Sequence, residues 1–222
     1  MRLFGPLHIS LVAAIGTIAI ALAWLCRRGT VPMRGARLVI GWVLAVNEAV
    51  WWVYRYSREG IHANNLPLQA CDITVWLAVF GCFTAVPWLV EFAYFAGVAG
   101  AGMALLTPNL WSPWPSYPAI YFFVAHGGIV IAVTLLAFGG FAPFRASAVW
   151  RSFGLLLGYA ALVAAVNAAL GSNYMFLSHK PEHVSLLDNL GPWPWYILGG
   201  AGTGIVFFWI LWLPVRLWRG QA

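Results

Sequence analysis

PAIYFFVAHGGIVIAVTLLAF, residues 118–138, is the stretch that decides the fold. It contains 21 residues without Asp, Glu, Lys or Arg, and His126 is its only basic side chain. A helix needs about 20 mostly apolar residues to cross the hydrocarbon core of a bilayer. The stretch therefore predicts a transmembrane helix that carries a histidine inside the membrane.

Six further apolar runs of similar length flank this stretch, at residues 7–26, 38–56, 67–86, 88–107, 150–171 and 193–214. Hydrophobic residues make up 62% of the 222-residue chain and charged residues 8%, whereas soluble domains are about half apolar and about a quarter charged. We expect an all-α, polytopic bundle of seven transmembrane helices that forms one domain over residues 1–222. The first run resembles a signal peptide, but Arg27 and Arg28 follow it directly in place of a small-residue cleavage site, so we expect it to be retained.

The net charge is +6, but the basic residues lie in the gaps between the apolar runs. This argues against a nucleic-acid partner and favours anionic lipid headgroups. Basic residues are enriched on the cytoplasmic side of membranes. We therefore expect a multi-pass protein of the cell membrane, with its N-terminus outside and its C-terminus inside. In this orientation eight basic residues lie inside and four outside. Those inside are Arg27, Arg28, Arg34, Arg37, Arg145, Arg151, Arg216 and Arg219. Those outside are Arg2, Arg55, Arg58 and Lys180.

A polar loop, residues 173–192, separates the last two apolar runs. In the expected orientation it lies outside, and we expect it to form an ordered lid over a polar cavity. Its charged and histidine side chains are His179, Lys180, Glu182, His183 and Asp188.

Aromatic side chains collect at membrane boundaries, and those expected at the outer boundary are Trp51, Trp52, Trp111, Trp114, Trp193 and Trp195.

Small residues occur at helical spacing in two of the predicted spans. Gly97, Gly100 and Gly102 lie in the fourth apolar run, and Gly200 and Gly204 form a GxxxG pattern in the last one. Such patterns let the backbones of membrane helices approach closely. We expect these glycines to mark helix packing rather than function.

Seven polar side chains within the predicted spans fall in the outer half of the membrane, while Glu91 lies near the inner end of its span. Ionisable groups inside a bilayer are costly, so they are functional candidates by default. The seven are His8, Asn47, Glu48, Cys71, Asp72, His126 and Asn167. They predict a cavity that opens toward the outer leaflet. The alternative is a hydrogen-bond network that only locks the helices together.

The residue types restrict the chemistry of such a cavity. The chain contains no HExxH or CxxC motif, so we expect no metal and no cofactor. Its one lysine, Lys180, lies in the loop, which argues against a retinal Schiff base. The chain also contains no GxSxG motif, which would indicate a serine nucleophile.

A cysteine nucleophile with a histidine base fits the pattern better. A thiolate is a strong nucleophile that needs only a nearby base or cation. Cys71 and His126 have compatible predicted depths, and Glu48 or Asp72 is expected to orient or charge the imidazole. The alternative is that Cys71 is a small, buried apolar residue, as many cysteines are.

Ordered pieces of the sequence resemble a known family: LHI at His8, NE at 47–48, LPLQAC at 66–71, TPNLW at 107–111, AHGGIV at His126, and NYMFLSHKP with SLLDNLGPWPWY at 173–196. The chain resembles the YwaF-type integral membrane proteins of bacteria. That family is similar to an animal seven-helix transmembrane acyltransferase, which moves a fatty acyl chain between phospholipids through a cysteine and a histidine. The resemblance implies Cys71 as the nucleophile and His126 as the base. The family pattern LPLHLC has a histidine where this chain has Gln69.

The compatible depths of Cys71 and His126, together with the family resemblance, predict a lipid acyltransferase or a thiol-dependent acyl hydrolase. Its substrate would be a phospholipid or another acyl lipid. The rival hypothesis is a non-enzymatic lipid carrier, or the membrane subunit of a lipid-transport complex with partner proteins. A solute transporter is less supported because we find no inverted repeat. Residues expected to bind or orient the substrate are His8, Asn47, Glu48, Asn167, Asn173, Tyr174, His179, Lys180 and Asp188.

Overall fold

The computed structural model describes residues 2–110, 112–140, 144–181 and 185–219, and these ranges contain helices and no strand. They form seven α-helices and two short 3₁₀ helices, η1 and η2. The bounds are α1 Pro6–Arg27, α2 Met33–Glu59, α3 Ala70–Thr84, α4 Pro87–Leu106, α5 Tyr117–Phe138, α6 Ser147–Leu170, η1 Tyr174–Phe176, η2 Leu186–Leu190 and α7 Trp195–Arg219. The predicted all-α class is therefore confirmed for the described residues.

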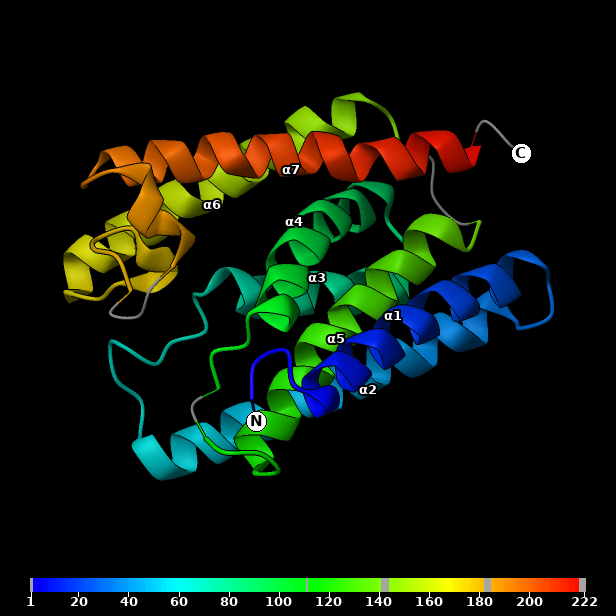
Figure 1. Cartoon of the computed structure of the whole chain (residues 1–222), viewed down its shortest axis with the longest axis horizontal. Coiled ribbons are helices and arrows are strands. Elements are labelled where there is room, and N and C mark those ends of the chain that lie inside the picture. Colours follow the sequence, from blue (N-terminus) through cyan, green and yellow to red (C-terminus); the bar gives the residue numbers. More distant parts are fainter. Residues whose placement is uncertain (1, 111, 141–143, 182–184, 220–222) are drawn as a thin grey trace.

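The helices run back and forth along one axis, and the two termini lie at opposite ends of it (Figure 1). α5 lies centrally and contacts α1, α2, α3 and α4. α6 and α7 pair with each other on one side of the bundle and reach the other helices mainly through α4. The ends of α2 and α6 and the starts of α3, α5 and α7 all face the same end of the molecule (Figure 1).

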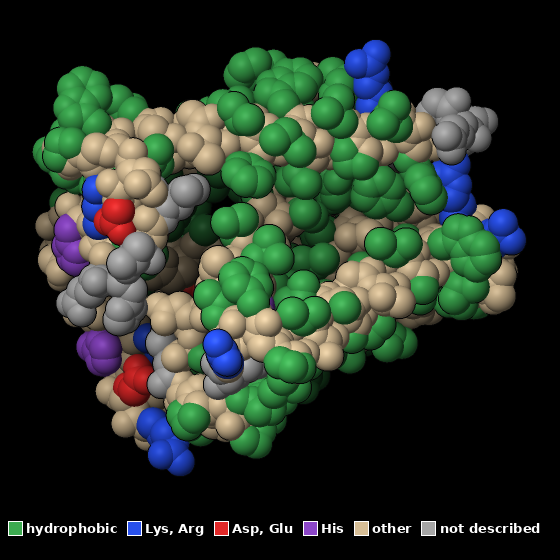
Figure 2. All heavy atoms as spheres, in the orientation of Figure 1, with side chains coloured by type: hydrophobic (Ala, Val, Ile, Leu, Met, Phe, Trp, Pro, Cys, Tyr) green, Lys and Arg blue, Asp and Glu red, His purple; other side chains and the backbone are tan. Residues whose placement is uncertain are grey.

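Six of the helices are long and apolar enough to cross a membrane, among the residues that the structure describes. Their outer faces carry large apolar side chains: Ile20, Val53, Leu162 and Leu198 are 60–71% exposed. Figure 2 shows such side chains spread over the flanks of the bundle, while most Lys and Arg residues lie near its two ends. A soluble protein would not expose apolar surface on this scale, so the chain is a multi-pass membrane protein.

α3 is the exception in length. It has 15 residues, which gives a helix about 22 Å long, short of the roughly 30 Å hydrocarbon core. The approach to it, residues 60–69, is not helical, and Pro67 in this approach disfavours a helical conformation of the residue before it. The apolar run at 67–86 thus contains a shorter helix than predicted, and a seventh spanning helix stays a prediction.

Both ends of α3 have identifiable caps. At the start, the Gln69 and Asp72 side chains form a reciprocal capping box with each other's backbone amides. At the end, Ala85 takes a left-handed conformation with φ 60°, and the Arg37 guanidinium of α2 donates to the Phe83 carbonyl at 3.0 Å. A cation near the last carbonyls of a helix stabilises its negative end.

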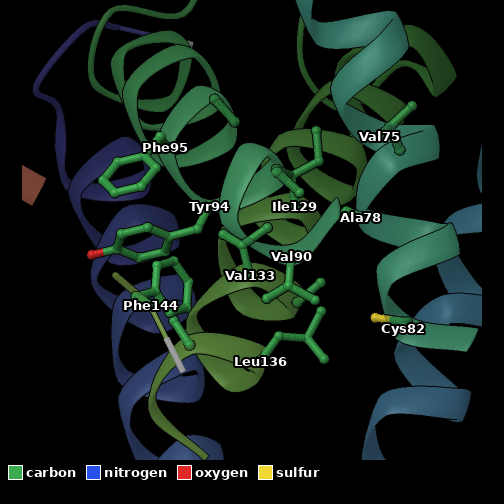
Figure 3. Close-up of a cluster of buried hydrophobic side chains, with 14 of the residues drawn as sticks. Val75, Ala78, Cys82, Val90, Tyr94, Phe95, Ile129, Val133, Leu136 and Phe144 are labelled. Atoms are coloured by element: carbon green, nitrogen blue, oxygen red, sulfur yellow. The ribbon is translucent and has the colours of Figure 1, made fainter. Parts of the chain in front are cut away.

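The main core lies where α3, α4 and α5 meet, and Figure 3 shows its apolar side chains interlocking. Cys82 is fully buried in this cluster, as are Val90 and Leu136. Close approach at glycines tightens the packing around α5: a Cβ at Gly128 would lie 2.5 Å from Leu44 Cδ2, and one at Gly97 would lie 2.8 Å from Ile129 Cγ2. Gly97 therefore marks close packing, as predicted.

The other predicted packing glycines behave differently. A Cβ at Gly100 or Gly102 would meet nothing within 4 Å, and at Gly200 and Gly204 the nearest atoms would lie at an ordinary 3.8 Å. The GxxxG pattern of α7 therefore accommodates no closely packed helix backbone. These two glycines leave space beside the helix.

Glu91 lies toward the opposite end of the bundle from Cys71 and His126. Its carboxylate is buried and forms an ion pair with Arg151 of α6. A carboxylate left alone in this environment would be costly, so the pair accounts for a charge inside α4. It also ties α4 to α6, the helix that is otherwise less closely attached to the bundle.

Candidate active site

One cavity of about 320 Å³ collects polar residues from several helices at the end of the molecule where α3 and α5 begin. Glu48 of α2, Cys71 and Asp72 of α3, and His126 of α5 all line it. These residues are separated by up to 78 positions in the chain, yet they face the same space. The sequence prediction that their matched depths reflect a shared cavity is in agreement with this geometry.

Cys71 is the second residue of α3, directly after the capped helix start, and its side chain is half-buried. The first turn of a helix carries a partial positive charge and amide groups without intrahelical acceptors. The helix start favours a thiolate at this position, whereas burial opposes it most strongly and the neighbouring Asp72 opposes it by charge repulsion. Asp72 accepts a hydrogen bond from the Gln69 amide at 2.9 Å, which fixes its carboxylate in the cap.

The His126 ring is held by its own helix. Its Nδ1 lies 2.8 Å from the Phe122 carbonyl oxygen, and the two rings lie against each other with centroids 4.2 Å apart. A carbonyl can only accept, so Nδ1 carries the proton in the neutral ring and Nε2 carries the lone pair. The imidazole is therefore in the tautomer that a general base needs, with its lone pair on Nε2.

Glu48 is fully buried and bonded to neutral donors. The Trp52 indole N–H donates to one of its oxygens at 2.6 Å, and the Tyr121 hydroxyl donates to the other at 2.9 Å. Trp51 stacks on Tyr121 with ring centroids 4.1 Å apart. Among the described residues neither Glu48 nor Asp72 hydrogen-bonds the imidazole. The Phe122 carbonyl therefore orients the His126 imidazole, the role that was expected of Glu48 or Asp72.

Gln69 occupies the position where the family pattern has a histidine, and its side chain joins two parts of the site. Its Oε1 takes part in the cap of α3 and also accepts from the Met175 amide at 2.9 Å. Gln69 therefore connects the start of the Cys71 helix to the loop at Met175, next to Phe176 of the cavity wall. In this chain the position has a structural use that needs no proton transfer.

Asn167 and Tyr174 hold the start of that loop through hydrogen bonds. Asn167 donates to the Tyr174 carbonyl and accepts from its amide, both at 2.9 Å. The Tyr174 hydroxyl donates to the Ala63 carbonyl at 2.7 Å and accepts from the Leu66 amide at 2.6 Å. Burial raises the pKa of this hydroxyl, so it stays protonated at neutral pH. The two residues join the end of α6 to the approach to α3, while an ordered lid over residues 173–192 stays a prediction.

The polar residues farther along the loop bond within it. The Asn173 amide group donates to the His179 carbonyl at 2.9 Å, and Lys180 Nζ lies 5.5 Å from the centre of the Tyr196 ring. Asp188 accepts from the Ser185 amide at 2.8 Å and caps η2. Glu182 and His183 of this loop, and Trp111 of the expected aromatic belt, lie outside the described residues.

His8 and Asn47 lie away from the cavity. The His8 ring is buried between the Leu105 carbonyl, 2.8 Å from Nε2, and the Phe4 amide, which donates to Nδ1 at 3.1 Å. Asn47 lines a separate, open groove between α2 and α5. Depth along a helix does not fix the direction in which a side chain points, which is why both were grouped with Glu48. Their contribution to substrate binding stays a prediction.

Some cavity residues escaped the sequence analysis. Trp51 was expected at the membrane boundary but is buried against the site, and Arg55 stands one turn beyond it with its guanidinium 3.1 Å from the Glu59 carboxylate. Glu48, Trp51 and Arg55 share one face of α2 through their spacing of three and four residues, which is a signal that the sequence contained. Further polar or aromatic additions to the cavity wall include Thr107, Asn109, Tyr121 and Phe176.

The comparisons with known proteins add one finding. The sequence profile of the TMEM164 family matches residues 3–212, nearly the whole chain. No curated protein and no solved structure gives a significant match. The matched range includes the cavity, the loop 173–192 and most of α7.

Proposed function

This chain belongs to the TMEM164 family, and from its cavity we propose that it is a membrane-embedded lipid acyltransferase with Cys71 as the nucleophile and His126 as the general base. One observation carries the proposal: a thiol at the start of a helix and an imidazole whose Nδ1 is held by a backbone carbonyl line the same cavity. The proposal also includes the relation to bacterial YwaF-type proteins, placement in the cell membrane, and a cavity open to the outer leaflet.

The first half of the reaction transfers the acyl group to the protein. His126 Nε2 takes the proton from Cys71 Sγ, and the thiolate attacks the ester carbonyl of a phospholipid. The new C–S bond forms, the ester C–O bond breaks, and the leaving oxygen takes its proton from the imidazolium. A lysolipid departs and a thioester remains on Cys71.

The second half returns the acyl group to another lipid. His126 Nε2 deprotonates the hydroxyl of an acceptor lysolipid, whose oxygen attacks the thioester. The C–S bond breaks and the thiolate is reprotonated by the imidazolium. Water as the acceptor would give hydrolysis, and a site that opens among lipids beneath an ordered loop disfavours that outcome.

Other groups around the cavity suit the remaining tasks. The first-turn amides of α3 next to Cys71 are placed to stabilise the negative charge that develops on the carbonyl oxygen. Arg55, with Thr107 and Asn109, supplies charge and polar groups at the cavity wall for a phosphate headgroup. The charge of Arg55 is shared with Glu59, so a phosphate would compete with that carboxylate.

The test uses purified protein in nanodiscs with a phospholipid donor and a labelled lysolipid acceptor. Cys71→Ala and His126→Ala should each reduce transfer at least about a hundredfold, while Cys82→Ala, which changes a thiol buried in the core, should retain it. Wild-type protein, but not Cys71→Ala, should give an acyl thioester detectable by mass spectrometry. Transfer by Cys71→Ala at the wild-type rate would overturn the proposal. Lipid binding without transfer by the wild type would favour the carrier.

A further inference from the structure

A second cavity, of about 190 Å³, lies between α6 and α7 and is bounded at one end by the loop. Its walls are almost entirely apolar, with Leu156 and Ala160 of α6 facing Ile197 and Ala201 of α7. An apolar cavity of this kind is unsuited to a headgroup and suited to hydrocarbon.

The glycines of α7 create this space. Gly200 and Gly204 both line the cavity, and neither is closely approached by another helix. The cavity extends along α7 from Tyr196 to Gly204, a distance of about 12 Å at 1.5 Å per residue. It therefore runs from the loop into the membrane, parallel to the helices, which is the direction of a lipid tail whose head lies at the loop.

Phe176 joins the two cavities, because it lines both the cavity of Cys71 and the apolar one. Met175 and Phe176 have positive φ values of 57° and 55°, a conformation that is unfavourable for residues with a side chain. Three hydrogen bonds hold the segment there. The Met175 amide donates to Gln69 Oε1 at 2.9 Å, the Tyr196 hydroxyl donates to the Phe176 carbonyl at 2.6 Å, and the Trp193 indole donates to the Leu177 carbonyl at 3.2 Å.

The strained segment at Met175 and Phe176 is held by these three hydrogen bonds. It places the Phe176 side chain at the boundary between the polar cavity of Cys71 and the apolar cavity. Strain of this kind persists only where the surroundings impose it, and it clusters at functional sites. An acyl lipid needs both spaces at once, since its ester and head are polar and its chain is not. The polar cavity suits the ester and head of such a lipid, and the apolar cavity suits its chain.

We infer that the cavity between α6 and α7 holds the hydrocarbon chain of the acyl lipid whose ester lies at Cys71, with Phe176 at the point where the chain enters. The inference rests on the proposed function and names the part of the substrate that this site selects. A lipid tail in a bilayer is already in an apolar medium, so the cavity offers little hydrophobic driving force. Its effect is selection by length and shape.

Gly204 marks the deep end of the cavity, so Gly204→Leu should shorten the accepted chain. Its nearest neighbour leaves room for a side chain. The control is Gly202→Leu, the same change on an exposed face of the same helix, where a Cβ would meet nothing within 4 Å. With donors of graded chain length, Gly204→Leu should reduce transfer from long chains relative to short ones at least about tenfold. Gly202→Leu should leave the chain-length profile unchanged.

A second measurement does not depend on turnover. A phospholipid with a diazirine at the end of its acyl chain is photo-crosslinked to the Cys71→Ala protein, and the labelled peptides are identified. Labelling within residues 153–160 or 197–204, reduced in Gly204→Leu and kept in Gly202→Leu, supports the inference even if no transfer is found. Equal labelling of both glycine variants, or a chain-length profile that Gly204→Leu leaves unchanged, overturns it. In that case transfer by the wild type would leave the proposed reaction standing without this cavity.

Discussion

The two sides of the bundle are packed in opposite ways. In α5 67% of the most apolar window is buried within the protein, against 11% in both α6 and α7. At Gly128 an added carbon would lie 2.5 Å from Leu44, whereas at Gly204 the nearest atom would lie at 3.8 Å. The same residue type thus permits close packing in one half and leaves a cavity in the other. The tight half fixes the positions of Cys71 and His126, and the loose half contains the apolar cavity that we propose for the substrate chain.

The strongest test of this contrast is a pair of matched substitutions. Gly128→Leu should lower the free energy of unfolding by about 1–3 kcal/mol, because the new side chain overlaps Leu44 in a packed interior. Gly204→Leu should leave stability nearly unchanged, because its side chain enters existing space. Both changes raise helix propensity equally, so this term cancels. Thermal unfolding of both variants in the same detergent measures this difference in stability. Equal destabilisation of both would contradict the difference in packing between the two sides of the bundle.

The helix cap of α3 offers a second test, at the junction of the two halves. Gln69→Ala removes an acceptor from the Met175 amide and half of the capping box, which should cost about 1–2 kcal/mol. Acyl transfer should fall more than stability, since the change acts on both the start of the Cys71 helix and the loop above it. Transfer rate and unfolding are measured on the same preparation. Gln69→Glu keeps an oxygen acceptor and should retain most of the stability, and a Gln69→Ala protein with unaltered transfer would contradict this role.

The Tyr174 hydroxyl allows a finer test of how the loop is attached. Tyr174→Phe leaves the ring in place but removes the partners of the Leu66 amide and the Ala63 carbonyl. Amide exchange in residues 60–69 and 173–177 should accelerate about tenfold, as expected for the loss of roughly 1–2 kcal/mol of local protection. Exchange in α5 should not change. Hydrogen exchange followed by mass spectrometry measures both regions, and acceleration in both would mean that the loop and the core unfold together.

The orientation of the bundle is tested by cysteine labelling alone, without a measurement of activity. Ser185→Cys, introduced in a chain with Cys26, Cys71 and Cys82 replaced by Ala, should react with a membrane-impermeant maleimide on intact cells. The reason is the excess of basic residues at the other end of the molecule, which favours the cytoplasmic side. Labelling that requires lysis would invert the orientation. A cysteine at Arg34 serves as the opposite control.

Much of this arrangement could be predicted from the sequence, because membrane helices are defined by long apolar runs and polar residues within them are rare. Cys71, Glu48 and His126 share a cavity, as their depths suggested. Depth could not predict the direction of each side chain around its helix, so His8 was grouped with them although its ring bonds Leu105. The apolar cavity escaped prediction for another reason. Gly200 and Gly204 read as a packing motif, and only the placement of the neighbouring helix reveals that they leave space.

The short length of α3 has a consequence for how a reaction at Cys71 would depend on its substrates. With its far end held by Arg37, a helix of about 22 Å ends roughly 8 Å short of the opposite edge of a 30 Å hydrocarbon layer. In the proposed reaction the thiol, at the near end of the helix, then lies inside the hydrocarbon layer but within the depth of one leaflet, so a donor would not have to leave its leaflet. Substrate would arrive by lateral diffusion within the membrane plane. The rate should then follow the mole fraction of donor among the lipids and fall on surface dilution with an inert lipid, while the bulk lipid concentration has no effect.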